Sequence, residues 1–127
     1  MSDLNPKGIP VMIGGVERHF LFTLNAIDDI QDHFEKPLSE VVQQFTEKEQ
    51  AYKTMRYVAM VLINDEAERE RAAGREGYEI LTEQEVGWLI TLKNEGEVAL
   101  AILKAYGYSL PESEDENPNR ESGQTME

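Results

Sequence analysis

The sequence contains no cysteine, which excludes disulfides, thiolate metal sites and cysteine nucleophiles. It contains only two histidines, His19 and His33, so a zinc site would need carboxylates to complete its ligands. No apolar run approaches the roughly 18 to 20 residues that span a bilayer. Basic residues are also scarce, since 12 Lys and Arg stand against 25 Asp and Glu, for a formal net charge of −13. Such a surface repels phosphate backbones and anionic lipids, so we expect neither a nucleic-acid partner nor a membrane partner.

The length and apolar content predict one domain. The chain has 127 residues, of which 40% are hydrophobic, enough for a single core. Its first ten residues, MSDLNPKGIP, contain no basic segment followed by an apolar one, so we expect a cytoplasmic location. We predict a flexible N-terminus over residues 1–8, a folded domain over 9–108 and a disordered acidic tail over 109–127.

Residues 9–22 have the pattern of a β-hairpin. An apolar, largely β-branched stretch, Ile9 to Ile13, precedes Gly14-Gly15, and the run VERHFLF follows. Two glycines can adopt the positive φ values that a type I′ turn requires. Side chains alternate between the two faces of a strand, which predicts a core face and a solvent face for the second strand. The core face holds Val16, Phe20 and Phe22, and the solvent face holds Glu17 and His19.

The stretch from residue 25 to Gly74 predicts three helical segments. Asn25 is the predicted N-cap of the first helix, which carries apolar residues on one side and ends near Lys36-Pro37. A short helical piece over 38–45 follows. A long, central helix then begins at the capping-box sequence TEKE, residues 46–49, and ends at Gly74.

The C-terminal half predicts two further helices. The sequence TEQE, residues 82–85, is a second capping box, and the helix that it opens is expected to run to Lys93. A last amphipathic helix follows the interruption at residues 94–96 and is expected to stop at Gly107. The predicted fold class is α+β, with an N-terminal β-hairpin packed on a bundle of four to five α-helices.

Two groups of apolar side chains lie off the faces that these helices are expected to bury. Each group is either a second core contact or an exposed surface for a partner or a second copy. The first group lies on the helix after the second capping box, and the other is a stripe at spacings of three and four on the central helix. The candidate partner-binding residues are therefore Trp88 and Leu92 in the first group and Tyr57, Met60 and Val61 in the second.

Catalytic and metal chemistry have little support in the sequence. Asp29 and His33 are four residues apart on one helix and form the best local metal pair, but a third ligand is missing. Asp28 and Asp32 lie on a solvated helix face, which perturbs carboxylate pKa values little. We therefore expect no enzyme activity, no cofactor and no metal site. A small metal-dependent enzyme built on these acids and the histidines is the weakest alternative.

Two stretches of the sequence resemble the bacteriophage tail assembly chaperones, small acidic proteins encoded upstream of the tape measure protein in long-tailed phages. The first is GGVERHFLFTLNAIDDIQDHFEKPLSEVV, from Gly14 to Val42. Members of this family begin with a strand, a glycine turn, a second strand ending in aromatic residues, and a helix opened by a Leu-Asn-Ala segment. The second is LTEQEVGWLI, from Leu81 to Ile90, which is similar to their later helix. The acidic tail after Pro111 also fits, and the resemblance covers roughly residues 9 to 110.

The resemblance implies a non-enzymatic protein of the host cytoplasm that is absent from the mature virion. Such chaperones bind the long, mostly helical tape measure protein and keep it soluble until tail tube subunits displace them. The implied partners are the tape measure protein and the tail tube protein. The family also implies a longer form of the chain, made by a ribosomal frameshift near its end, and a change after Pro111 would fall in a tolerant place. Exposed apolar stripes would also favour a homo-oligomer.

The acidity fits one alternative, an acidic decoy whose carboxylates imitate DNA phosphates and occupy a DNA-binding protein. Such a decoy should carry its acids in spaced rows on the folded surface. Here the predicted tail holds six acidic residues and one arginine, so a large share of the net charge lies outside the domain. Salt separates the alternatives, because a decoy complex should weaken steeply with salt and a helix-in-groove complex little.

Overall fold

The computed structural model describes residues 7–46 and 48–109, which form an α+β structure as predicted. An antiparallel hairpin, β1 (Ile9–Ile13) and β2 (Val16–Phe20), comes first. The helices that follow are α1 (Leu24–Phe34), α2 (Leu38–Gln43), α3 (Lys48–Ala72), α4 (Glu83–Leu89) and α5 (Glu95–Ser109), with a short 3-10 turn at Gln44–Thr46. The predicted flexible N-terminus and acidic tail lie outside the described residues, except for Lys7, Gly8 and Ser109.

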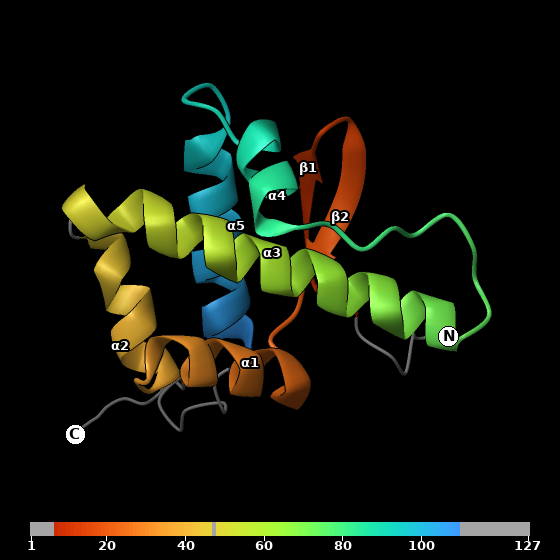
Figure 1. Ribbon diagram of the computed structural model, residues 1–127, viewed down its shortest axis with the longest axis horizontal. Helices are drawn as coiled ribbons and strands as arrows, with labels where there is room; N and C mark the ends of the chain where they lie inside the picture. Colours follow the sequence, from red (N-terminus) through yellow and green to blue (C-terminus); the bar gives the residue numbers. More distant parts are fainter. Residues whose placement is uncertain (1–6, 47, 110–127) are drawn as a thin grey trace, which may run out of the picture.

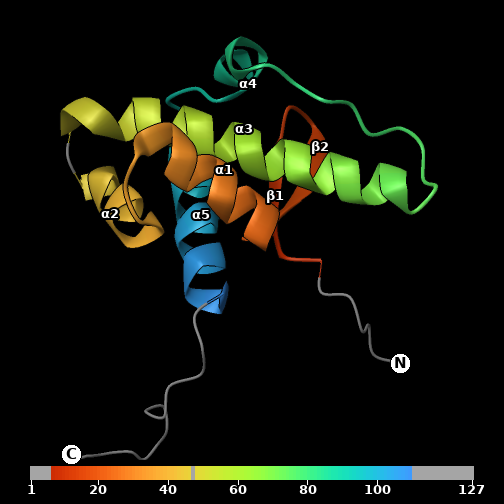
Figure 2. The same cartoon turned by 60° about the horizontal axis from the view of Figure 1, so that its bottom comes forward.

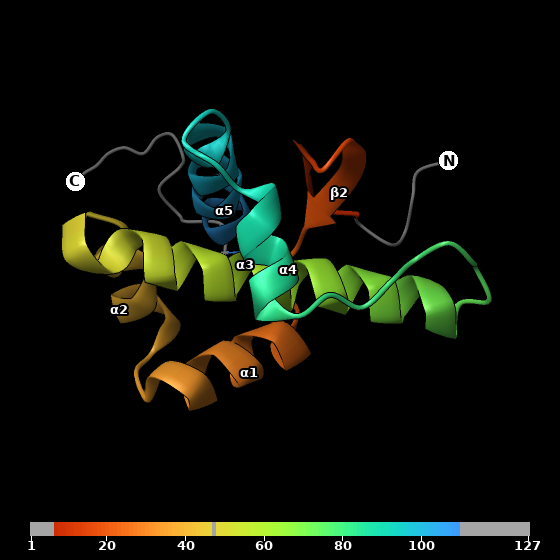
Figure 3. The same ribbon diagram turned by 45° about the horizontal axis from the view of Figure 1, so that its top comes forward.

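The long helix α3 is central, and the other elements pack around it (Figure 1). Figure 3 shows α1 and α2 on one side of α3, with α5 and the hairpin on the other. α5 runs crosswise to α3 rather than along it, as Figures 1 and 2 show. α4 lies against α3, between the hairpin and the start of α5. Within the described ranges, no helix is long and apolar enough to cross a membrane.

The hairpin turn forms as the glycine pair predicts. Ile13 pairs with Val16, so two residues make the turn, and both have positive φ, 65° at Gly14 and 76° at Gly15.

Two predictions for β2 are wrong. Val16 is 49% exposed because it borders an open hollow between the hairpin and the connector before α4. His19 is half-buried because it binds a carboxylate of α3.

The N-cap of α1 is Thr23, so the prediction of Asn25 is wrong. The hydroxyl of Thr23 accepts from the Ala26 N–H at 3.1 Å and donates to Asp65 of α3 at 2.9 Å. Tertiary contact with α3 therefore selects the threonine over the asparagine.

The long helix α3 ends before Gly74 as predicted, and that glycine has φ 88°. Its predicted capping box includes residue 47, which lies outside the described part of the chain.

The second capping box forms as predicted. The Thr82 hydroxyl accepts from the Glu85 N–H at 3.1 Å, and the Glu85 carboxylate accepts from the Thr82 N–H at 2.8 Å. The helix does not reach Lys93, however. The Asn94 amide donates to the Leu89 carbonyl at 3.0 Å and accepts from the Thr91 N–H at 2.7 Å, so α4 ends at Leu89.

α5 also differs from its prediction, because it continues through Gly107 to Ser109. A glycine costs a helix about 1 kcal/mol relative to alanine, which packing of the preceding turn can offset. The ring of Tyr106 meets that of Phe22 edge to face, with centroids 6.4 Å apart. This contact holds the last turns of α5 against the start of the helical region.

One core joins the hairpin to the helices. Burying a large apolar side chain contributes about 1.5–3 kcal/mol, so these side chains fix the placement of the elements around α3. The largest fully buried apolar side chains are Ile13, Phe20, Ile30, Val41, Val58, Leu62, Ile63, Val86, Val98 and Ile102.

Candidate partner-binding surface

The structure separates the five candidate residues into two groups. Trp88 is 70% exposed and Leu92 is 80% exposed, so both offer apolar area to solvent. Val61, in contrast, is only 6% exposed, and Tyr57 and Met60 are half-buried. The first group is therefore the more exposed, while Tyr57, Met60 and Val61 border a smaller hollow of about 190 Å³.

The stripe on α3 packs against α1. The Tyr57 ring stacks on His33, with centroids 3.7 Å apart and planes 11° from parallel, and it meets Phe34 edge to face at 5.5 Å. Burial raises the pKa of the Tyr57 phenol, and the nearby charge of Asp29 acts in the same direction. Tyr57 therefore makes a second packing contact, one of the two alternatives that the sequence left open for this stripe.

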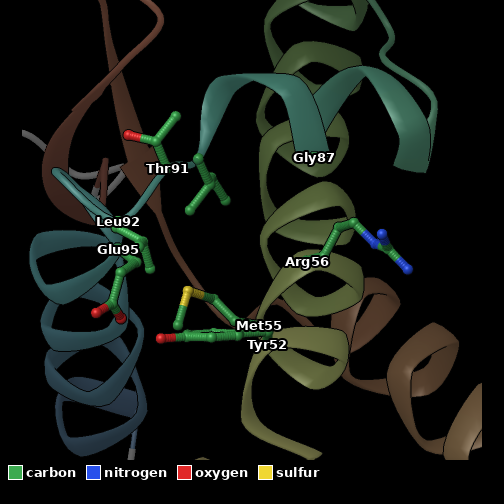
Figure 4. A pocket seen from close by; sticks show the side chains of 8 residues that line it. Tyr52, Met55, Arg56, Gly87, Thr91, Leu92 and Glu95 are labelled. Carbon is green, nitrogen blue, oxygen red and sulfur yellow. The ribbon is translucent and has the colours of Figure 1, made fainter.

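Leu92 lines a hollow between α3, α4 and the start of α5. Its volume is about 310 Å³, and Figure 4 shows how its walls are built. Tyr52 and Met55 of α3 face Leu92 and Glu95, which lie just before and at the start of α5. We call this hollow the α3–α5 groove; its lining residues are Tyr52, Met55, Arg56, Gly87, Ile90, Thr91, Leu92 and Glu95.

A second hollow adjoins the groove under α4. It shares Arg56 and Gly87 with the groove and is bordered by Trp88. A Cβ atom at Gly87 would lie 3.0 Å from the Cδ atom of Arg56, so the missing side chain lets α4 approach α3 closely. The Arg56 Nε atom lies 3.2 Å from the Glu83 carboxylate, which neutralises the guanidinium next to Trp88. Trp88 and Leu92 thus belong to one continuous surface.

Contacts at both ends hold α4 in place. The side chain of Asn64 on α3 makes two 2.8 Å hydrogen bonds with Leu81, accepting from its N–H and donating to its carbonyl. At the other end, a Cβ atom on Gly14 would lie 3.0 Å from a methyl carbon of Leu89. The hairpin turn and α3 therefore fix the helix that carries Trp88, so the surface is preorganised rather than a loose loop.

The groove is apolar and carries little unpaired charge. Ile90 and Met55 supply apolar area, and Tyr52 is 57% exposed at the rim. Glu95 is the acid of the lining, and it forms no ion pair with any residue that the structure describes. On a chain with a net charge of −13, this weakly charged surface suits an apolar partner.

Sequence reasoning missed the α3 wall of the groove. Tyr52 and Met55 share the broad apolar face of α3, which predicts burial for both, yet only Met55 is buried. Tyr52 lies at the rim, and the segment after α4 supplies Ile90, Thr91 and Leu92 to the same hollow. Aromatic residues with a polar end are common at binding surfaces, which was the one signal available for Tyr52.

Asp29 and His33, the pair for which the sequence offers no third ligand, both lie on α1. Within residues 7–46 and 48–109, no group of three His, Cys, Asp or Glu side chains is placed to hold a metal ion. His33 stacks on Tyr57, and Asp28 and Asp32 remain exposed on α1.

A scan against protein-family models, a search of curated proteins and a search of solved structures found no match to this chain. The likeness to tail assembly chaperones rests on the two quoted sequence stretches, the acidic tail and the order of the elements.

Proposed function

We propose that this protein is a phage tail assembly chaperone that binds the tape measure protein and keeps it soluble during tail assembly. The observation that carries the proposal is the preorganised apolar surface formed by Trp88, Leu92 and the α3–α5 groove. An exposed tryptophan and leucine beside an apolar hollow are typical of a protein-binding surface.

The resembling stretches support this proposal through the elements they form. Residues 14–42 span the glycine turn, β2, α1 and most of α2, and residues 81–90 span α4 with both its caps. The second stretch contains Trp88 itself. The part of the chain that resembles the family's later helix is thus also the part that presents apolar area to solvent.

The charge of the chain fits the same role. Apolar side chains in the groove can cover apolar segments of a long helical protein that would otherwise aggregate. A net charge of −13 then gives the complex a repulsive exterior that opposes association between complexes. In this proposal the tail tube protein later displaces the chaperone, and the family's longer frameshifted form and a homo-oligomer remain further expected partners.

A co-expression pull-down tests the proposal. Tagged protein is expressed with a tape-measure fragment and the tail tube protein, and the complex is washed at low and at high salt. We expect recovery of the tape-measure fragment at both salt concentrations, with its solubility dependent on this protein. Failure to recover either tail protein, together with salt-sensitive capture of a defined DNA-binding protein, would instead favour the acidic decoy.

A further inference from the structure

We infer that the α3–α5 groove docks one amphipathic helix of the partner, with an apolar side chain in the hollow and a Lys or Arg beside Glu95. The inference deepens the proposed function and rests on it for the identity of the partner. It identifies the surface that binds and the chemistry that the surface selects.

The size of the groove fits side-chain insertion. A cavity of about 150 Å³ accommodates a benzene ring, so a hollow of about 310 Å³ has room for a leucine or phenylalanine side chain and its neighbours. Leu92 and Tyr52 stand at its rim, where they can close over an inserted side chain (Figure 4). Trp88 borders the adjoining hollow, which gives the surface two neighbouring depressions.

The surroundings favour a helix over an extended peptide. An extended segment that adds to a sheet pairs its main-chain groups with an exposed strand edge. The described residues that line the groove come from α3, α4, α5 and the turn between the last two, and none belongs to a strand. A helix satisfies its own main-chain groups, and its side chains one turn apart, about 5.4 Å, suit two adjoining hollows.

Charge selects a basic partner over a second copy of the chain. Glu95 lies in the groove without a cationic partner among the described residues, so a Lys or Arg on the docking helix would complement it. A second copy brings another net charge of −13 and, in a symmetric contact, the same acid. Both effects disfavour self-association through this surface.

The test uses two designed helical peptides of about 20 residues with the same leucine stripe, one flanked by lysines and the other by glutamates. Trp88 is the sole tryptophan of the chain, so its emission reports binding at this surface directly. We expect the lysine peptide to shift the emission to shorter wavelength and to bind with an affinity that moderate salt reduces only in part. The glutamate peptide should bind at least about tenfold more weakly.

Paired variants test whether the lysine peptide binds at the groove or is attracted only by the negative charge of the whole protein. Leu92→Asp should weaken the lysine peptide about tenfold or more, while Leu24→Asp should leave its affinity unchanged. Leu24 is a matched control, because it is 84% exposed and begins α1, which lies below α3 in Figure 1, whereas α4 lies above it. Glu95→Lys should reduce the preference for the lysine peptide, whereas Glu97→Lys, in the same first turn of α5, should not. Thermal unfolding of each variant confirms that it folds.

Three results would overturn the inference. Equal effects of Leu92→Asp and Leu24→Asp would mean that exposed apolar area in general binds the peptide. Equal effects of Glu95→Lys and Glu97→Lys would mean that Glu95 makes no specific contact with a cation of the partner helix. Conversion of a dimer to a monomer by Leu92→Asp, seen by analytical ultracentrifugation, would identify a second copy as the occupant.

The tape-measure fragment distinguishes this inference from the proposed function. If wild-type protein and Leu92→Asp solubilise the fragment equally well, the chaperone role stands and the groove is not its site. If the peptides follow the expected pattern but wild-type protein does not solubilise the fragment, the groove binds helices and the proposed function fails.

Discussion

The imidazole of His19 lies 2.8 Å, through Nδ1, from a carboxylate oxygen of Glu66, and the His19 main-chain N–H donates to the other oxygen at 2.9 Å. One buried carboxylate on α3 therefore engages both the side chain and the main chain of β2. The N–H concerned lies on the outer edge of the hairpin, where the described part of the chain places no further strand. This contact fixes the hairpin on α3, and through its glycine turn the hairpin also contacts α4.

Glu66→Ala should destabilise the fold by about 1–3 kcal/mol. The substitution leaves a partly buried N–H without its acceptor and removes the carboxylate beside the imidazole. Glu68→Ala, at an exposed position two residues along α3, is the control and should change stability by less than about 0.5 kcal/mol. Urea unfolding of both variants measures the difference, and equal midpoints would refute the role of this contact.

Asn64→Asp should loosen α4. The aspartate keeps an acceptor for the Leu81 N–H but places a second oxygen against the Leu81 carbonyl, in place of the amide donor. We expect a loss of about 1–3 kcal/mol and faster hydrogen exchange in α4. Asn25→Asp, at an exposed position of α1, serves as the comparison. Unchanged exchange in α4 would show that Asn64 does not position this helix.

Local signals predicted most of the fold. The pair Gly14-Gly15 and the capping box at Thr82 each determine a turn or a helix start within a few residues, and both form as expected. The wrong predictions concern residues whose roles depend on partners far away in the sequence. Thr23 becomes a helix cap because its hydroxyl also meets Asp65, and His19 turns inward because Glu66 binds it, partners 42 and 47 residues away.

The candidate site was only partly predictable for the same reason. For Trp88 the sequence left burial and exposure open, and the structure shows it 70% exposed on the helix that buries Val86. The burial of Val61 and the contact between Tyr57 and α1 depended on which side of α3 the first helix would cover. The wall that Tyr52 supplies depends on where the segment after α4 lies relative to α3, which spacing along the sequence does not reveal.

Gly14→Ala should cost more stability than Gly15→Ala. Both glycines have positive φ, so a side chain at either position costs about 1–2 kcal/mol. Only at Gly14 would the new Cβ atom also press on Leu89, at 3.0 Å, since nothing lies within 4 Å of the corresponding atom at Gly15. The emission of Trp88, on the same helix as Leu89, should therefore change in Gly14→Ala alone. Identical spectra and midpoints for the two variants would contradict the close packing.

The phenol of Tyr57 should lose its proton at a higher pH than that of an ordinary tyrosine. Burial raises the pKa of its phenol above 10.0, and the charges of Asp29, Glu83 and Asp32 add to the effect. The folded state therefore binds this proton more tightly than the unfolded state does. The resulting stability is complete below about pH 10 and is lost as the pH rises through the folded pKa.

Absorbance at alkaline pH measures this titration. Comparison of the wild type with Tyr57→Phe isolates the Tyr57 component, which should lie above pH 10 and move down in Asp29→Asn. An ordinary titration midpoint for that component would mean that the contact with α1 leaves the phenol in water.

The aggregation of a tape-measure fragment tests the central claim most directly. The fragment is diluted from denaturant into buffer with wild-type protein, with a Trp88→Ala, Leu92→Asp double variant, or with Leu24→Asp, and light scattering is followed. We predict that wild-type protein and Leu24→Asp suppress scattering in proportion to their concentration, while the double variant does not. Scattering that rises equally with all three proteins would contradict a chaperone role.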